Sequence, residues 1–349
     1  MRRTIVLVAV LLVSCTSSIA PSPTPATNTG VTSLAPSPTS SATIAAIVTA
    51  PPANASPTPI PLPSFADIAA AGSGVVWVLV ADQHLFRSLD RGATWEERDV
   101  PQLPLGPMKN ISFVDDRDGW LLTVGSPATG CMAQGFTVWR TTDGASTWER
   151  AHQATFSSSP LAGGCKSRVA FVDPQHGYID VAGRDVPPAV LRTSDGGTTW
   201  TLSQRLPDPP GFVFEPSIST LQPGALGDFG SVVLVSAGSF VNGTAQRHIF
   251  RSTDHGATWS YIRTAPSDAD IVFLTPTRWL QVVPGSSSVE TTDAGASWHA
   301  FATDYSQAAA VAPQIVFGDS TTGYASVRGT LQRTTDAGAH WTSLTTPGT

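Results

Sequence analysis

The stretch that decides the fold is L-R-T-S-D-G-G-T-T-W, residues 191–200, whose pattern Ser/Thr-x-Asp-x-Gly-x-Thr/Ser-Trp occurs six times along the chain. The six copies contain the pairs Asp90 and Trp95, Asp143 and Trp148, Asp195 and Trp200, Asp254 and Trp259, Asp293 and Trp298, and Asp336 and Trp341. Successive aspartates are 53, 52, 59, 39 and 43 residues apart. Repeat lengths in this range are typical of propellers and solenoids.

The residue types of the motif indicate a turn between two β-strands. An Asp side chain accepts hydrogen bonds from backbone amides that follow it, and glycine adopts a positive φ at little cost. The tryptophan can bury on the order of 200 Å² of surface on the returning strand. The second copy has Ala145 at the glycine position and the sixth has His340 at the Thr/Ser position, so we expect looser turns there.

A second, weaker pattern precedes three of the hairpins. Asp and Gly lie four residues apart, after a Phe and before an aromatic residue, in the segments 113–120, 171–178 and 317–324. Each repeat is therefore predicted to form four strands, which in the first repeat are Asp67–Ala71, Val75–Ala81, His84–Leu89 and Thr94–Val100. Four antiparallel strands per repeat are the blade of a β-propeller.

The predicted fold is all-β, with residues 65–349 forming a propeller of six four-stranded blades. A seventh blade without the motif could lie in the 59-residue interval between Asp195 and Asp254, and residues 58–64 could add a strand.

The N-terminus is predicted to be a lipoprotein signal. Arg2 and Arg3 precede a nine-residue apolar run, Ile5 to Val13, which is too short to span a bilayer about 30 Å thick. The segment L-V-S-C, residues 12–15, resembles the bacterial lipobox, which implies removal of residues 1–14 and lipidation of Cys15. The alternative is an ordinary secretory signal with a chance cysteine.

Residues 15–64 are predicted to be a disordered tether. Residues 16–66 contain no Asp, Glu, Lys or Arg and are rich in Ser, Thr, Ala and Pro, so they cannot form a hydrophobic core. The expected location is extracytoplasmic, with the lipid on Cys15 anchoring a monomeric propeller to the cell membrane.

The remaining two cysteines, Cys131 and Cys165, are predicted to form a disulfide, because an even pair is left in an oxidising compartment. Neither has the spacing of a metal ligand, and the histidines show none either, so we expect no metal and no cofactor. The formal net charge is −6, which argues against binding nucleic acid.

The motifs resemble known families. The six copies resemble the Asp-box (bacterial neuraminidase, BNR) repeat, and their combination with the Phe-x-Asp-x-x-x-Gly-aromatic segments looks most like the photosystem II assembly and stability factor group of propellers. That resemblance implies a binding or assembly scaffold for a protein or glycan partner, without enzymatic activity. The alternative is a sialidase-like glycoside hydrolase.

The sialidase resemblance implies an arginine triad, a tyrosine nucleophile assisted by Glu, and an aspartate acid/base. The sequence lacks the Arg-Ile-Pro motif of the first sialidase arginine. The candidate nucleophiles are Tyr178, Tyr261, Tyr305 and Tyr324. Tyr178 and Tyr324 occupy the repeated aromatic position after Gly, which favours a place in the core.

Five repeats have an arginine three residues before the motif aspartate, namely Arg87, Arg140, Arg192, Arg251 and Arg333, while the fifth repeat has Glu290. They could form an anion-binding ring, but recurrence at one repeat position favours a structural role against tryptophan rings or neighbouring carbonyls. Asp115–Gly119 faintly resembles a calcium loop, and a blade turn is the favoured interpretation.

The segments 124–136, 153–166 and 206–228 are longer than their counterparts in other repeats. Because long loops on a rigid scaffold often carry binding function, we expect a partner to contact this side of the propeller.

Overall fold

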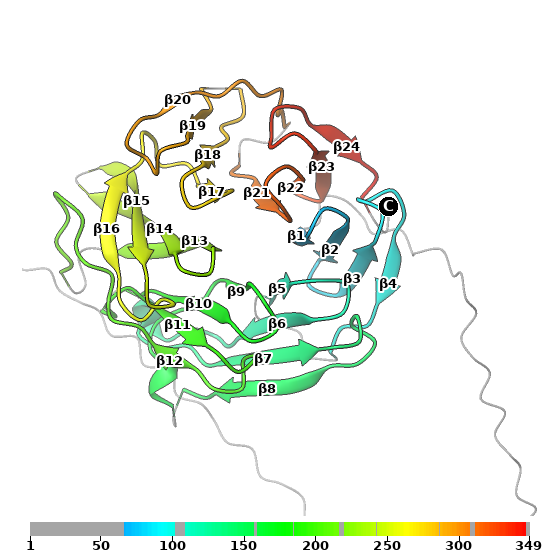
Figure 1. Ribbon diagram of the computed structural model, residues 1–349. Coiled ribbons are helices and arrows are strands. Elements are labelled where there is room, and N and C mark those ends of the chain that lie inside the picture. The colour runs from blue at the N-terminus through cyan, green and yellow to red at the C-terminus, as the bar shows by residue number, and fades with distance from the viewer. Residues whose placement is uncertain are drawn as a thin grey trace, which may run out of the picture. The chain divides into compact units, whose positions relative to one another are not determined.

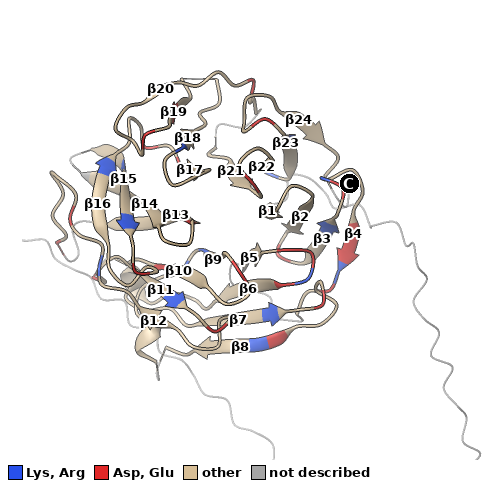
Figure 2. Ribbon diagram, in the orientation of Figure 1, with Lys and Arg blue, Asp and Glu red and all other residues tan. Residues whose placement is uncertain are grey.

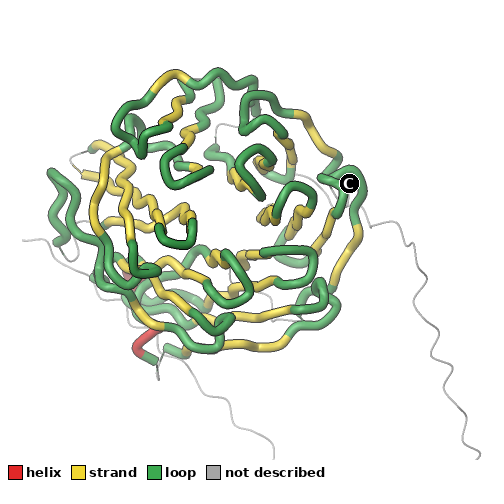
Figure 3. The backbone as a smooth tube through the Cα atoms, viewed as in Figure 1, coloured by secondary structure: helices red, strands yellow, loops and turns green. Residues whose placement is uncertain are grey.

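The computed structural model describes residues 66–101, 109–156, 159–183, 185–215, 220–241, 243–285, 287–307 and 311–346. The predicted signal, Cys15 and the tether lie outside these residues. The described chain is a ring of antiparallel sheets (Figure 1, Figure 3). It also contains two short 3₁₀ turns, η1 (Thr129–Cys131) and η2 (Pro160–Ala162). None of its described helices is long or apolar enough to span a membrane.

Six four-stranded sheets form the blades, and in each the strands pair in chain order. The first three blades are β1 (Ala66–Ala71), β2 (Val75–Val80), β3 (His84–Ser88) and β4 (Glu96–Arg98); β5 (Lys109–Phe113), β6 (Gly119–Val124), β7 (Phe136–Thr141) and β8 (Glu149–Ala154); and β9 (Val169–Phe171), β10 (Gly177–Val181), β11 (Ala189–Thr193) and β12 (Thr201–Leu202).

The last three blades are β13 (Leu221–Asp228), β14 (Val233–Val241), β15 (Thr244–Ser252) and β16 (Ser260–Thr264); β17 (Val272–Phe273), β18 (Trp279–Gln281), β19 (Val289–Thr291) and β20 (His299–Ala300); and β21 (Gln314–Phe317), β22 (Gly323–Val327), β23 (Thr330–Thr334) and β24 (Thr342–Leu344).

The prediction of six four-stranded blades is confirmed. No seventh sheet occurs among the described residues between Asp195 and Asp254, because longer strands and the connection after β12 occupy that interval. In the first blade the strands lie where the sequence predicts them, except that β4 is shorter than the predicted segment Thr94–Val100.

The core lies between adjacent blades and explains the second sequence pattern. Phe113 of β5 stacks on Trp77 of the preceding blade with ring centroids 3.8 Å apart, and Phe171 stacks on Trp120 at 3.7 Å. A Cβ at Gly119 would lie 2.1 Å from the Phe113 ring. The glycine is therefore required because the Phe side chain of the paired strand lies across it.

The two faces of the ring differ in their connections. In an antiparallel blade, the turns after the first and third strands lie on one face, and the turns after the second and fourth strands lie on the other. All six Asp boxes follow third strands, so they share one face, which we call the Asp-box face. The long connections follow β6, β8 and β12 and share the opposite face, which we call the loop face.

Candidate functional site

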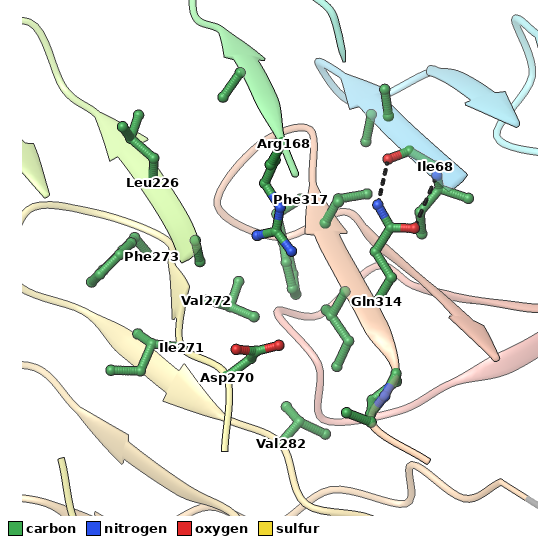
Figure 4. A pocket seen from close by; sticks show the side chains of 18 of the residues that line it. Ile68, Arg168, Leu226, Asp270, Ile271, Val272, Phe273, Val282, Gln314 and Phe317 are labelled. Atoms are coloured by element: carbon green, nitrogen blue, oxygen red, sulfur yellow. Dashed lines mark hydrogen bonds between the residues drawn. The ribbon is translucent and has the colours of Figure 1, made fainter. Parts of the chain in front are cut away.

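The first strands of the six blades surround the centre of the ring (Figure 1) and line a cavity of about 810 Å³. The connections at 282–285, 306–307 and 311–313 also line it, so the cavity extends to the loop face between the last two blades. Most lining side chains are aliphatic, including Ile68, Leu226 and Val272 (Figure 4). A pre-formed apolar recess with a few polar groups is typical of a ligand site.

Arg168 is the polar group that reaches into this cavity without a partner. It lies one residue before β9, and its guanidinium points into the space between the walls (Figure 4). Within the described chain no carboxylate lies within 4.0 Å of that guanidinium and it forms no hydrogen bond, although the backbone amide of Arg168 donates to Asp180 at 2.9 Å. The side chain is therefore free to bind an anion.

The acid that lines the opposite wall is already paired. Asp270 forms a salt bridge of 2.8 Å with Arg247, whose guanidinium also donates to the carbonyl of Asp268. Asp270 is the one acidic residue among the described residues that line the cavity. The two cationic groups near the cavity thus differ, because Arg247 has its carboxylate and Arg168 does not.

Two buried aspartates lie near Arg168 without contacting its guanidinium. Burial raises the pKa of Asp67 to about 6, although hydrogen bonds from Ile111 and Gln314 and the charge of Arg168 partly offset this. Burial likewise raises the pKa of Asp180, which accepts hydrogen bonds from Ser167. Both carboxyl groups are held by donors of the protein itself, so they serve the scaffold.

On the loop face of the second and third blades, three connections are linked to one another. A disulfide joins Cys131, in the β6–β7 connection, to Cys165, in the β8–β9 connection. Cys165 pairs with Ala182 in the β10–β11 connection through backbone hydrogen bonds of 2.7 and 3.1 Å. The disulfide therefore staples the second and third blades, as the sequence predicts.

The staple is supported by a buried ammonium group. Lys166 is only 1% exposed, and its Nζ donates to the carbonyls of Gly163, Gly164 and Gln134 at 2.7, 3.0 and 3.3 Å. Burial lowers the pKa of this side chain to about 8. We call the three connections, held by the disulfide and by Lys166, the stapled loops.

Apolar side chains are exposed around the same face. Met132 and Phe156 of the stapled loops are 55% and 62% exposed, and Phe240 at the end of β14 is 65% exposed. Leu89, on the Asp-box face, is 53% exposed, so single apolar residues also occur elsewhere. The loop face differs in combining such residues with the cavity and the stapled loops.

The predicted insertion at 206–228 requires a correction. Residues 221–228 form β13, the inner strand of the fourth blade, so only the segment before it is a connection. Leu206 and Phe212 of that segment are buried against Val233 and neighbouring core residues. Similarly, the predicted loops 124–136 and 153–166 include the ends of β6, β7 and β8.

The Asp boxes form local hydrogen-bond networks. In the fourth box, Asp254 accepts from the amide and hydroxyl of Thr258 at 2.9 and 2.6 Å and from the Ser252 hydroxyl at 2.7 Å. In all six boxes the motif aspartate accepts a hydrogen bond from the backbone amide four residues later, at Asp90, Asp143, Asp195, Asp254, Asp293 and Asp336.

The expectation of looser turns in the second and sixth boxes is wrong. Ala145 adopts a positive φ of 63°, where the motif glycines of the other boxes have φ between 77° and 93°, and its amide donates to the Thr141 hydroxyl at 3.0 Å. His340 replaces the threonine by donating its amide to Asp336 at 2.9 Å and placing its ring nitrogen 2.6 Å from the carboxylate.

Two of the box arginines donate to carbonyls of neighbouring blades, which agrees with the structural interpretation. Arg87 donates to the carbonyl of Asp116 at 2.8 Å and lies 5.6 Å from the ring centroid of Trp77. Arg333 donates to the carbonyl of Arg91 across the ring closure. In the fifth blade, Glu290 pairs with Arg278 at 3.1 Å. Basic segments therefore lie near the ends of β3, β7 and β11 (Figure 2), away from the cavity lining.

The candidate tyrosine nucleophiles do not line the cavity. Tyr178 donates to Asp228 at 2.7 Å, and Tyr324 is fully buried, with burial raising its pKa to about 12. Tyr305 packs against Trp341, and Tyr261 lies 3.0 Å from the Thr264 hydroxyl on the outer strand. The structure does not gather these residues around one site.

The acidic turn at Asp115–Gly119 is a blade turn. Asp115 accepts from the amides of Arg117 and Asp118 at 2.7 and 2.6 Å, and Asp319 makes the equivalent bonds in the sixth blade. The described residues contain no cluster of three or more metal-ligating side chains.

Sequence reasoning missed Arg168, Asp67, Gln314 and the cage around Lys166. Arg168 stands outside every repeated motif, and that irregularity is the signal that could have singled it out. Lys166 is one of two lysines in the chain, which was a similar signal.

The fold and cavity define the chain as a six-bladed β-propeller of the Asp-box type. No protein-family model and no curated protein sequence matches it. Among solved structures it is similar to YCF48 from Cyanidioschyzon merolae, at 15% identity over 80% of this chain and 95% of that one, with a TM-score of 0.45. YCF48 bound to D1 peptide matches at 16% identity over 80% and 93%, with a TM-score of 0.39.

A glycosidase propeller has a comparable likeness. The α-L-arabinofuranosidase Arb93A from Fusarium graminearum, in complex with an iminosugar inhibitor, is 12% identical over 79% of this chain and 91% of that one, with a TM-score of 0.51. At 12% identity, the likeness to Arb93A shows the fold alone.

Proposed function

We propose that the chain is a non-catalytic binding propeller, which holds a protein or glycan partner at its loop face. The observation that carries this proposal is the convergence on one face of the cavity mouth, the stapled loops and exposed apolar side chains such as Phe156 and Phe240. Rigid loops that present apolar groups on a fixed scaffold are typical of binding sites.

The chemistry of the cavity supports binding over glycoside hydrolysis. A glycosidase places two carboxyl groups about 5–10 Å apart across its substrate, one of them free to donate or accept a proton. Here Asp270 is salt-bridged to Arg247, and Asp67 is held by three donors from neighbouring blades. Each acid has a structural partner.

We further propose that the chain is lipidated on Cys15 and that residues 15–64 tether the propeller outside the cytoplasm. Metabolic labelling with an alkyne fatty acid tests the anchor. Label on the natural chain and none on Cys15→Ser is the expected result, and equal labelling of both would overturn it.

The loop face is tested by site-specific photo-crosslinking. A photoreactive amino acid at Phe156 or Phe240 should yield the same crosslinked partner, and one at Leu89, on the Asp-box face, should not. All three positions are exposed, so accessibility alone predicts equal crosslinking. Adducts from Leu89 only, or equal adducts from all three, would contradict the proposal.

A further inference from the structure

The cavity combines mostly aliphatic side-chain walls with one arginine, Arg168, that has no described carboxylate within 4.0 Å of its guanidinium. Its volume of about 810 Å³ is within the usual size of small-ligand sites. Arg168 projects into it from the third blade, while the aliphatic side chains of Ile68, Leu226 and Val272 cover the surrounding walls (Figure 4). This combination defines which ligand chemistry fits.

The charge favours a carboxylate. A guanidinium carries five donors in a planar fork, which matches the two oxygens of a carboxylate. The nearby acids do not occupy it, because Asp270 pairs with Arg247, Asp67 accepts from Gln314 and Asn110, and Asp180 accepts from Ser167. An anion that reaches Arg168 therefore breaks no ion pair of the described protein.

The walls favour an apolar chain over a sugar. A sugar ring would need polar partners for several hydroxyl groups, since a buried hydroxyl without a hydrogen bond is costly. The side-chain amides of Asn110 and Gln314 are already bonded to Asp67 and, for Gln314, to the backbone of Ile68. An aliphatic chain needs no such partners and removes apolar surface from water.

We propose that the central cavity is a subsite for a single carboxylate borne on an aliphatic chain, with Arg168 binding the carboxylate. The ligand is either a small organic acid or the C-terminal carboxylate of a protein chain that ends in an apolar residue. This inference rests on the proposed binding function, whose partner contacts the loop face where the cavity opens.

Matched acid and amide probes test whether the ligand's carboxylate is needed in addition to its aliphatic chain. Small-molecule and peptide probes distinguish a small organic acid from a protein C-terminus. Hexanoate and hexanamide have the same apolar chain, and a heptapeptide ending in Val-Leu is used with a free and with an amidated C-terminus. Binding to the unit Ala55–Thr349, which contains every described residue, is measured by titration calorimetry and by saturation-transfer NMR.

Hexanoate or the free-acid peptide should bind at least tenfold more tightly than the matched amide, which identifies the source. Arg168→Gln should reduce that affinity tenfold or more, and Arg168→Lys should retain part of it. The matched control is Arg263→Gln, on the exposed outer strand β16, which should bind as the natural chain does.

Val272→Asp offers an independent variant that keeps the arginine. A carboxylate on the cavity wall should compete for Arg168 and abolish binding of the acid probe, with the thermal transition recorded to confirm folding. Equal affinity for acid and amide, or undiminished binding by folded Arg168→Gln, would overturn the subsite. Loss of the subsite with crosslinking at Phe156 intact would leave the proposed function standing.

Discussion

The side-chain amide of Gln314 donates to Oδ1 of Asp67 at 2.6 Å, which joins the sixth blade to the first. Its Oε1 accepts from the Ile68 amide at 3.1 Å, while Oδ2 of Asp67 accepts from Asn110 and from the Ile111 amide of the second blade. Each blade contains only strands contiguous in sequence, so side chains rather than a shared strand close the described ring.

Asp67→Asn should therefore destabilise the ring. The asparagine amide nitrogen would face a donor, and a buried unsatisfied donor costs about 1–3 kcal/mol. We expect urea unfolding to show a loss of about 2 kcal/mol at pH 7. Asp99→Asn, at the end of the first repeat, is the control and should change the free energy of unfolding by less than about 0.5 kcal/mol.

The raised pKa of Asp67, about 6, also gives a pH signature. Between pH 4 and 6 the folded protein holds this proton more tightly than the unfolded chain does, so Asp67 contributes stability at low pH that is lost as the pH rises through 6. The free energy of unfolding of the natural chain minus that of Asp67→Asn should therefore be largest at low pH and decrease as the pH rises through 6. A difference that stays constant from pH 4 to 7 would exclude this titration.

The Asp-box aspartates should make the folding stability increase with pH, opposite to the effect of Asp67 and in a lower pH range. Hydrogen bonds from Thr94 lower the pKa of Asp90 to about 2. At Asp336 burial raises the pKa, but hydrogen bonds from His340 and Thr334 outweigh that effect and lower the pKa to about 2. The folded protein binds these protons less tightly, so stability is present above pH 4 and is lost as the pH falls towards 2. Asp90→Asn should flatten the acid limb of the unfolding curve; an unchanged limb would contradict this role.

Gly119 should tolerate no side chain. Gly119→Ala would place a Cβ 2.1 Å from the Phe113 ring and disrupt its stacking on Trp77, so we expect a loss of at least about 3 kcal/mol. At Gly74 the nearest atom to an added Cβ is a carbonyl oxygen at 3.6 Å. Gly74→Ala should therefore cost less than about 1 kcal/mol, and similar losses for both variants would refute the packing argument.

The disulfide between Cys131 and Cys165 closes a sequence separation of 34 residues. Replacing both cysteines by serine should lower the free energy of unfolding by about 3–4 kcal/mol on the chain-entropy model. Amide hydrogen exchange should rise in the stapled loops and stay unchanged in the fifth blade. Faster exchange throughout the ring would show that the staple acts on the whole fold.

The sequence allowed the fold to be predicted because its signals repeat. Asp254 and Trp259 belong to a sequence motif within one hairpin, and Phe113 and Gly119 belong to a motif that spans two paired strands. Both motifs are local in sequence, so they can be recognised without knowledge of the tertiary structure. The six copies then gave the blade number.

The cavity could not be predicted in this way, because it depends on residues that do not repeat. Arg168 comes near Asp67, and lines the same cavity as Asp270, only after the ring closes, since these residues belong to the third, first and fifth blades. That Arg168 lines the cavity with no described carboxylate within 4.0 Å of its guanidinium is a property of the closed ring, and no local spacing encodes it. The insertion at 206–228 was misassigned in part because β13 contains Pro223 and glycines, which are unusual in strands.

The most direct test of the central claim is a turnover assay with fluorogenic sialosides, arabinosides and other glycosides, run on the unit Ala55–Thr349. A non-catalytic binding propeller predicts hydrolysis at the background rate for every substrate, with Asp270→Asn indistinguishable from the natural chain. Hydrolysis above background that Asp270→Asn abolishes would contradict the claim and make the cavity an active site.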